Sequence, residues 1–81
     1  MTALYNDKRT KSKKVNSLML CLRLNQHLTQ EKVAKMAGLD RGYYVKIENG
    51  QCIASVKAYR DIAIALGYPN WKNLIPNDRR L

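Results

Sequence analysis

The segment 28–50 constrains the fold more than any other part of the sequence, because it has the pattern of two short helices joined by a glycine turn. Thr29 is a good N-cap for the first helix, and Leu28 and Val33 occupy the positions of a hydrophobic staple. Gly38 is expected to end this helix in the left-handed conformation, where a Cβ atom is penalised. The segment therefore predicts a helix pair whose geometry is fixed by local chemistry.

The second helix of the pair is expected to begin after Asp40, whose carboxylate can cap its first turn. Leu39 and Tyr44 can form a second hydrophobic staple. The side chains expected to point inward from the two helices are Val33, Met36, Ala37, Tyr44 and Ile47. The residues left for the surface of the second helix are Arg41, Gly42, Tyr43, Val45, Lys46 and Asn49.

Helical patterns flank this pair on both sides, and no strand-like alternation extends beyond a few residues. From about residue 14 to 26, apolar residues repeat at helical spacing, at Val15, Leu18, Met19 and Leu22. A fourth helix is expected between an N-cap at Ser55 and a stop at Gly67, with a buried stripe of Val56, Tyr59, Ile62, Ala63 and Leu66. Pro69 suits the first turn of a short fifth helix that carries Trp71, Leu74 and Ile75. The expected fold class is all-α.

The charge is strongly basic and is concentrated near the start of the chain. The net charge is +9, which favours a polyanionic partner: nucleic acid, an acidic membrane surface or an acidic protein. Residues 1–13 are expected to form a flexible basic arm, residues 14–76 a single folded domain, and residues 77–81 a frayed tail. With no signal-peptide core and no apolar run of about 20 residues, we expect a cytoplasmic protein that does not enter a membrane.

The sequence offers little for catalysis or for metal binding. Cys21, expected near the core, and Cys52, expected in a loop, are interpreted as reduced thiols, and with a single His they supply no zinc-ligand spacing. Glu31 and Asp40 are explained by their helix-start positions, and no nucleophile motif or phosphate-binding glycine loop is present. We therefore expect no enzyme, no metal, no cofactor and no small-molecule ligand.

Taken together, these features resemble the lambda-repressor-like, Cro-type (XRE) helix-turn-helix family. The matching elements are Leu28-Thr29-Gln30-Glu31, Val33-Ala34, Ala37-Gly38-Leu39, Ile47-Glu48-Asn49-Gly50 and Ala65-Leu66-Gly67, within a match that covers about residues 15–75. The resemblance implies a compact five-helix DNA-binding domain in which helices two and three read DNA. It also implies a homodimer that binds a pseudo-palindromic double-stranded operator.

The resemblance also implies roles for particular residues. Arg41, Gly42, Tyr43 and Lys46 match base-facing positions. Apart from the resemblance, the apolar side chain of Val45 is suited to contact a thymine methyl group. The positions matched to phosphate contact are Gln30 and, through backbone N–H groups, Asn49, Gly50 and Gln51. Arg23 and Glu48 match an interhelical salt bridge, and Trp71, Leu74 and Ile75 lie in the region that the family uses for dimerisation. From the basic arm, Lys13 and Lys14 are expected to contact phosphate or the minor groove.

Elementary chemistry supports part of this assignment and leaves alternatives open elsewhere. The planar guanidinium of Arg41 fits the O6 and N7 acceptors of guanine, and Arg41 lies in the first turn of the helix. Tyr43 can contact a base, or it can lie flat on a neighbouring helix. Trp71 can complete the core or form a dimer contact. Gly42 offers no side chain for readout, so specificity would depend on fewer direct contacts or on DNA shape.

Three functions remain open at this point. The leading hypothesis is a sequence-specific, dimeric transcriptional regulator, a repressor of phage, mobile-element or restriction-controller type. We expect no room for a sensor domain in 81 residues, so that regulation would come from concentration, proteolysis or a regulatory protein partner. The alternative is an antitoxin or adaptor module that binds a protein first and DNA second. The third is a nonspecific nucleic-acid binder driven by charge.

Overall fold

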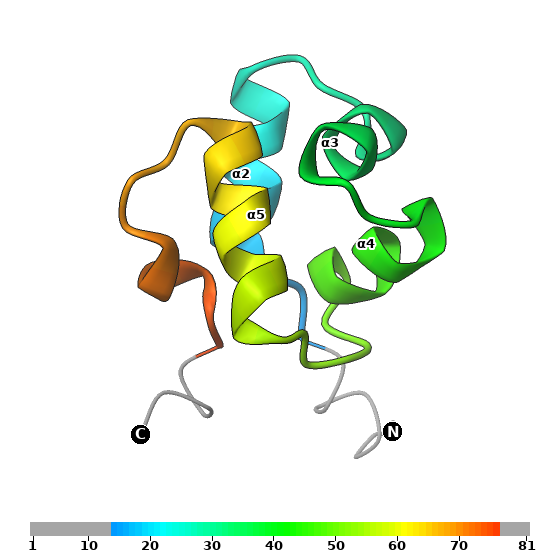
Figure 1. Ribbon diagram of the computed structural model, residues 1–81, viewed down its shortest axis with the longest axis vertical. Helices are drawn as coiled ribbons and strands as arrows, with labels where there is room; N and C mark the ends of the chain where they lie inside the picture. Colours follow the sequence, from blue (N-terminus) through cyan, green and yellow to red (C-terminus); the bar gives the residue numbers. More distant parts are fainter. Residues whose placement is uncertain (1–13, 77–81) are drawn as a thin grey trace, which may run out of the picture.

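A computed structural model describes residues 14–76 of the chain, which form an all-helical domain (Figure 1). The four α-helices are α2 (Ser17–Asn25), α3 (Gln30–Ala37), α4 (Arg41–Glu48) and α5 (Val56–Leu66). A 3₁₀ helix, η1 (Trp71–Leu74), follows them. Residues 14–76 contain no strand. The fold class is all-α as expected, but the fifth element is a short 3₁₀ helix, so the count of five α-helices is not confirmed.

The local signals around α3 and α4 act as the sequence predicts. The Thr29 side chain accepts a hydrogen bond from the Lys32 N–H at 3.0 Å, which caps α3. Gly38 ends α3 with a φ of 71°, in the left-handed region. The Asp40 carboxylate then accepts hydrogen bonds from the N–H groups of Gly42 and Tyr43, and α4 begins at Arg41. Caps and the glycine turn thus set the joint between the two helices.

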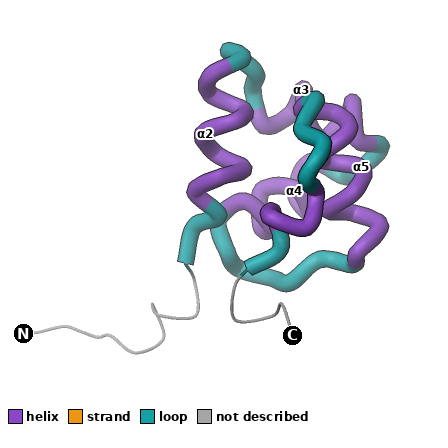
Figure 2. The backbone as a smooth tube through the Cα atoms, turned by 90° about the vertical axis from the view of Figure 1, so that its left-hand side faces the viewer, coloured by secondary structure: helices purple, strands orange, loops and turns teal. Residues whose placement is uncertain are grey.

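The core lies among the helices, with α3 packed on both α4 and α5 (Figure 2). The 3₁₀ helix η1 packs on α5 and on α2. The largest fully buried side chains are Tyr44, Tyr59, Met19, Ile47, Ile62, Leu74 and Val33. Since the core draws on all five elements, it holds α4 in place from inside and leaves the opposite side of α4 facing outward.

Three apolar residues expected inside are about half exposed instead. Met36 is 47% exposed, because Val33, Ala34 and Ala37 already fill the inward face of α3. Val56 is 53% exposed, because Ala54, Ala58 and Tyr59 fill the inward side at that end of α5. Val15 is 47% exposed because it precedes the helix, which starts only at Ser17. Cys21, expected near the core, is exposed as well.

No helix within residues 14–76 is both long enough and apolar enough to span a membrane. The expected arm, residues 1–13, and the expected tail, residues 77–81, lie outside the described residues.

Candidate nucleic-acid interface

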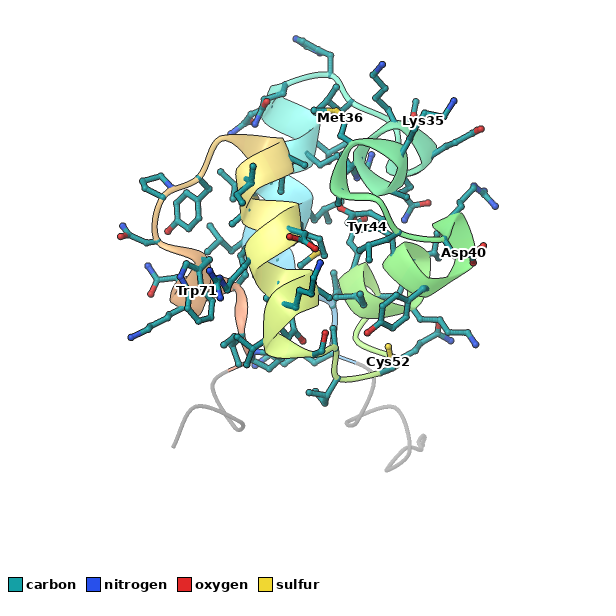
Figure 3. All side chains as sticks on the ribbon, viewed as in Figure 1. Lys35, Met36, Asp40, Tyr44, Cys52 and Trp71 are labelled. Atoms are coloured by element: carbon teal, nitrogen blue, oxygen red, sulfur yellow. The ribbon has the colours of Figure 1, made fainter. Side chains whose placement is uncertain are left out.

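The helix α4 has one buried side and one open side. Tyr44, Ile47 and Glu48 are buried, with Tyr44 pointing into the interior in Figure 3. Arg41 and Lys46 are exposed, and Val45 is half-buried. Because residues three or four apart share a helix face, Arg41 and Val45 present one outward strip. Of the side chains that the sequence assigns to base contact, Arg41 and Val45 share this strip, and Lys46 is exposed at the position after Val45.

Tyr43 is placed differently from its neighbours. Its side chain is half-buried and packs against the hydrophobic core. A ring held in this way has less freedom to reach outward than the side chain of Arg41. Tyr43 therefore lies at the edge of the outward strip.

Gly42 lies beside the carboxylate that caps α4. A Cβ atom at this position would approach Asp40 Oδ2 to 3.1 Å, which is tighter than ordinary van der Waals contact. The same Oδ2 accepts the hydrogen bond from the Gly42 N–H at 2.9 Å. Glycine at this position therefore leaves room for the cap, which gives it a structural reason independent of what α4 contacts.

The other end of α4 is held by a buried carboxylate, Glu48, whose side chain is 3% exposed. Arg23 donates from Nε to Glu48 Oε1 at 2.9 Å and from Nη2 to Oε2 at 3.0 Å, which is a bidentate ion pair between α2 and α4. Arg23 Nη1 also donates to the Leu28 carbonyl at 2.7 Å. The expected ion pair is present, and it ties α2 to both α4 and the start of the helix pair.

Two further donors complete this cluster. The Tyr44 hydroxyl donates to Glu48 Oε1 at 2.6 Å, and Gln30 Nε2 donates to Oε2 at 3.2 Å. Burial favours a higher pKa for the Glu48 carboxyl, but the hydrogen bonds from Arg23 and Tyr44 outweigh burial and hold its pKa below the ordinary value. Burial and the bond to Glu48 raise the pKa of Tyr44 above its ordinary range. The cluster is thus an ionised carboxylate with all of its partners protonated.

Gln30, expected to contact phosphate, is the first residue of α3 and is half-buried. Because the Glu48 carboxylate can only accept hydrogen bonds, it fixes which end of the Gln30 amide faces it. One N–H of the Gln30 amide is occupied by Glu48, and the second is not used by this bond. This contact was not anticipated from the sequence.

The loop after α4 corrects one expectation. The N–H of Gly50 donates to the Ile47 carbonyl at 3.1 Å, and that of Gln51 to the Lys46 carbonyl at 2.8 Å. The N–H of Asn49 donates to the Val45 carbonyl at 2.9 Å. These bonds close the end of the helix, with Gly50 in the left-handed conformation of a Schellman motif. The three N–H groups are therefore committed to α4 and are not offered to phosphate, although the side chains of Asn49 and Gln51 are exposed.

The backbone of Lys14 lies directly against Gly50. A Cβ atom on Gly50 would occupy the position of the Lys14 carbonyl group. The start of the folded domain is thus set beside the end of α4, and the side chain of Lys14 is exposed there. Lys13 lies outside the described residues.

The three residues expected to form a dimer contact differ in how far they are buried. Leu74 is 1% exposed and belongs to the core of the protomer, so its side chain is not available to a partner. Trp71 and Ile75 are half-buried. Arg60 and Lys72 lie over the Trp71 ring, at 5.7 and 5.9 Å from its centre. Trp71 lies across the molecule from Asp40 and the start of α4 (Figure 3).

Sequence reasoning missed Asn16, which links three parts of the fold. Its side chain caps α2 by accepting from the Met19 N–H at 3.2 Å and donates to the Leu74 carbonyl at 2.7 Å. Its own N–H donates to the Glu48 carbonyl at 2.8 Å. An Asn shortly before the apolar pair Leu18 and Met19 is a signal for the N-cap, but nothing local indicates the two long-range bonds.

The architecture and the surface of α4 define a small helix-turn-helix domain, and comparison with known proteins agrees. A family model described as helix-turn-helix matches residues 22–69, more than half of the chain. The chain belongs to the helix-turn-helix family, in its lambda-repressor-like XRE type.

Two curated relatives are similar to this chain. An ImmF control region 10 kDa protein from Bacillus phage phi105 is 39% identical over 54 residues, which is 67% of this chain and 60% of that protein. An uncharacterised HTH-type transcriptional regulator, YqaF, from Bacillus subtilis (strain 168) is 46% identical over 46 residues, which is 57% of this chain and 60% of that protein. The match thus spans about 60% of the length of each relative. No solved structure matches the chain significantly.

Proposed function

We propose that this chain is a sequence-specific double-stranded DNA-binding transcriptional regulator, without enzymatic activity, that acts through the α3–α4 unit. The observation that carries the proposal is the division of α4 into a buried side and an outward strip with Arg41 and Lys46 exposed. A helix presented in this way can enter the major groove. The net charge of +9 supports attraction to the phosphate backbone.

In the finer proposal, the protein is a dimeric repressor of phage, mobile-element or restriction-controller type, in the cytoplasm, on a pseudo-palindromic operator. In this proposal η1 takes the place of the fifth helix of a lambda-repressor-like domain. The names of the two relatives, a phage control region protein and an HTH-type transcriptional regulator, support this type. Two copies joined near Trp71 and Ile75 would bind half-sites about one helical turn apart.

Base contact is assigned to Arg41, Val45 and Lys46, with Tyr43 at the edge of the contact. Phosphate contact is assigned to Gln30 through its free amide N–H, to the side chains of Asn49 and Gln51, and to Lys13 and Lys14. Gly50 shapes the end of α4 and makes no DNA contact of its own in this proposal. Glu48 and Arg23 hold the helix in place.

Selection of bound sequences from random double-stranded DNA tests this proposal. The wild-type protein is expected to return a consensus, and Arg41→Ala is expected to lose preference at one base position in each half-site. Arg41→Lys keeps the charge but not the planar fork, so it should lose the same preference. Lys57→Ala, an exposed change on α5, should keep the consensus. A uniform weakening in the Arg41 variants would contradict base contact by this residue.

The second candidate is an antitoxin or adaptor module. It is favoured by the exposed apolar residues of α5, where Val56 is 53% and Ile64 is 77% exposed. A stoichiometric protein partner recovered together with a selection that yields no consensus would favour this candidate over the first. A nonspecific binder would instead show steep salt dependence and no consensus.

A further inference from the structure

Asn16 stands where three separate parts of the chain meet. Its backbone N–H bonds the last carbonyl of α4, at Glu48, and its side-chain amide bonds the carbonyl of Leu74 at the end of η1. Its side-chain oxygen caps α2. In Figure 1 the first and last described residues lie at the same end of the molecule, where these contacts are made.

We infer that Asn16 is a positioning residue that fixes the chain beyond η1 in register with the end of α4. The Leu74 side chain is held by the core, but its carbonyl sets the direction in which the chain leaves the domain. Asn16 anchors that carbonyl at 2.7 Å across 58 positions of sequence. A short neutral amide is suited to this position because it accepts and donates at once.

The segment that carries Asn16 has little freedom to slide. The Lys14 backbone fills the space where a side chain on Gly50 would lie, so the approach of this segment to the end of α4 is fixed two residues earlier. A shift of the segment would break the bond from Asn16 to Glu48 and the bond to Leu74 together. The link is therefore a stiff connection between η1 and α4.

This inference rests on the proposed function, in which two copies join near Trp71 and Ile75. Under that arrangement, the direction of the chain at Leu74 sets the dimer contact, and α4 sets the DNA contact. Asn16 connects the two, so it determines how strictly the dimer requires one spacing between half-sites.

Two variants break the link while they keep the cap of α2. Asn16→Asp retains the acceptor for the Met19 N–H and the backbone bond to Glu48, but sets a carboxylate oxygen against the Leu74 carbonyl. Asn16→Ser also retains a capping oxygen, adds no charge and is too short to reach Leu74. Asn70→Asp is the matched control, since Asn70 is exposed and its side chain makes no capping bond.

The first readout needs no DNA. The Ile75 N–H, bonded to the Lys72 carbonyl, reports whether the end of η1 stays docked. We expect its hydrogen exchange to accelerate in Asn16→Asp and Asn16→Ser and to stay unchanged in Asn70→Asp. Unchanged exchange in both Asn16 variants would overturn the inference. Because this readout does not involve DNA, it tests the role of Asn16 even if DNA selection yields no paired half-sites and the proposed function fails.

The second readout uses the operator that the wild-type protein selects, compared with the same operator carrying one inserted base pair and with a single half-site. We expect the ratio of the affinities for the selected operator and for the operator with the insertion to fall about fivefold in both Asn16 variants, which corresponds to the loss of one neutral hydrogen bond. The wild-type protein and Asn70→Asp should keep the full ratio. Half-site affinity of Asn16→Ser should match that of the wild type. An unchanged spacing preference, or a loss confined to the half-site, would contradict the role.

Discussion

The two ends of α4 are built in opposite ways. The N-terminal end is exposed, is capped by one carboxylate from Asp40, and carries Arg41 and Gly42 toward the outside. The C-terminal end is held by a buried ion pair at Glu48 and by close backbone packing at Gly50. The cap of the N-terminal end is local, whereas the C-terminal end is tied to α2, α3 and the start of the domain.

This difference suggests how a small domain can vary what it binds without losing its fold. The exposed residues at the open end, Arg41 and Gly42, can change with small effects on stability, because their side of α4 faces away from the core. Residues at the anchored end carry contacts from several elements, so changes there should act on the whole domain.

The largest effect is expected at the ion pair. Arg23→Met or Glu48→Leu alone should lower the free energy of unfolding by about 3–5 kcal/mol, because each leaves a buried charged side chain without its oppositely charged partner. The double variant should lose clearly less than the sum of the two. Urea unfolding of all four proteins measures the coupling. Additive losses would mean that the two side chains act independently and that the anchored end is not held by this pair.

A smaller loss of stability is expected when Gly50 is replaced by alanine. Gly67 has nearly the same backbone conformation, with a φ of 70° against 77°, but has open space around it. Gly67→Ala should therefore cost about 1 kcal/mol for the left-handed conformation alone. Gly50→Ala should cost at least about 2 kcal/mol, since the new methyl group also displaces the Lys14 backbone. Equal losses in the two variants, measured by urea unfolding, would show that the Lys14 contact contributes nothing.

Acid should weaken the anchored end through Glu48. The pKa of Glu48 lies below its ordinary value in the folded protein, so its contribution to stability is present above the unfolded pKa of about 4.3 and is lost as the pH falls through the folded value. The free energy of unfolding of the wild-type protein should fall on acidification below about pH 4.3. Glu48→Gln should be less stable at neutral pH and show a shallower fall. An identical acid slope in the two proteins would contradict the role of Glu48.

The smallest effect is expected at Gly42. Alanine gains up to about 1 kcal/mol in helix propensity, but its methyl group crowds the Asp40 cap at 3.1 Å. The two effects should nearly cancel, so Gly42→Ala should change the free energy of unfolding by less than about 0.5 kcal/mol. Asp40→Ala, which removes the cap, should cost about 1 kcal/mol and serves as the comparison. A loss at Gly42 as large as that at Gly50 would remove the contrast between the two ends.

The sequence predicts the open end of α4 well because its structure depends on neighbours in the chain. The caps at Thr29 and Asp40 and the turn at Gly38 follow from local hydrogen bonding and from the φ of glycine. The ion pair between Arg23 and Glu48 came from family resemblance, and no local signal would have paired residues 25 positions apart. The prediction that Met36 points inward was wrong, because three smaller residues already fill the inward face of α3.

The anchored end was predicted less well, for a physical reason. The pattern at Asn49 and Gly50 indicated a turn, but whether its N–H groups face outward depends on how the helix closes. Here the left-handed Gly50 directs them back to the carbonyls of α4. The contact of Gly50 with Lys14 and the bonds of Asn16 join residues far apart in sequence, and hydrophobic periodicity carries no information about them.

The separation of the two ends is tested most directly by measuring base preference and stability together in Arg41→Lys and Arg23→Met. We predict that Arg41→Lys loses preference at one base position of the selected operator with unchanged urea unfolding. We predict that Arg23→Met, at a temperature where it is folded, keeps the same base preferences and loses about 3–5 kcal/mol of stability. If Arg41→Lys keeps every preference, or if Arg23→Met alters a single base position, the two ends of α4 do not have separate roles.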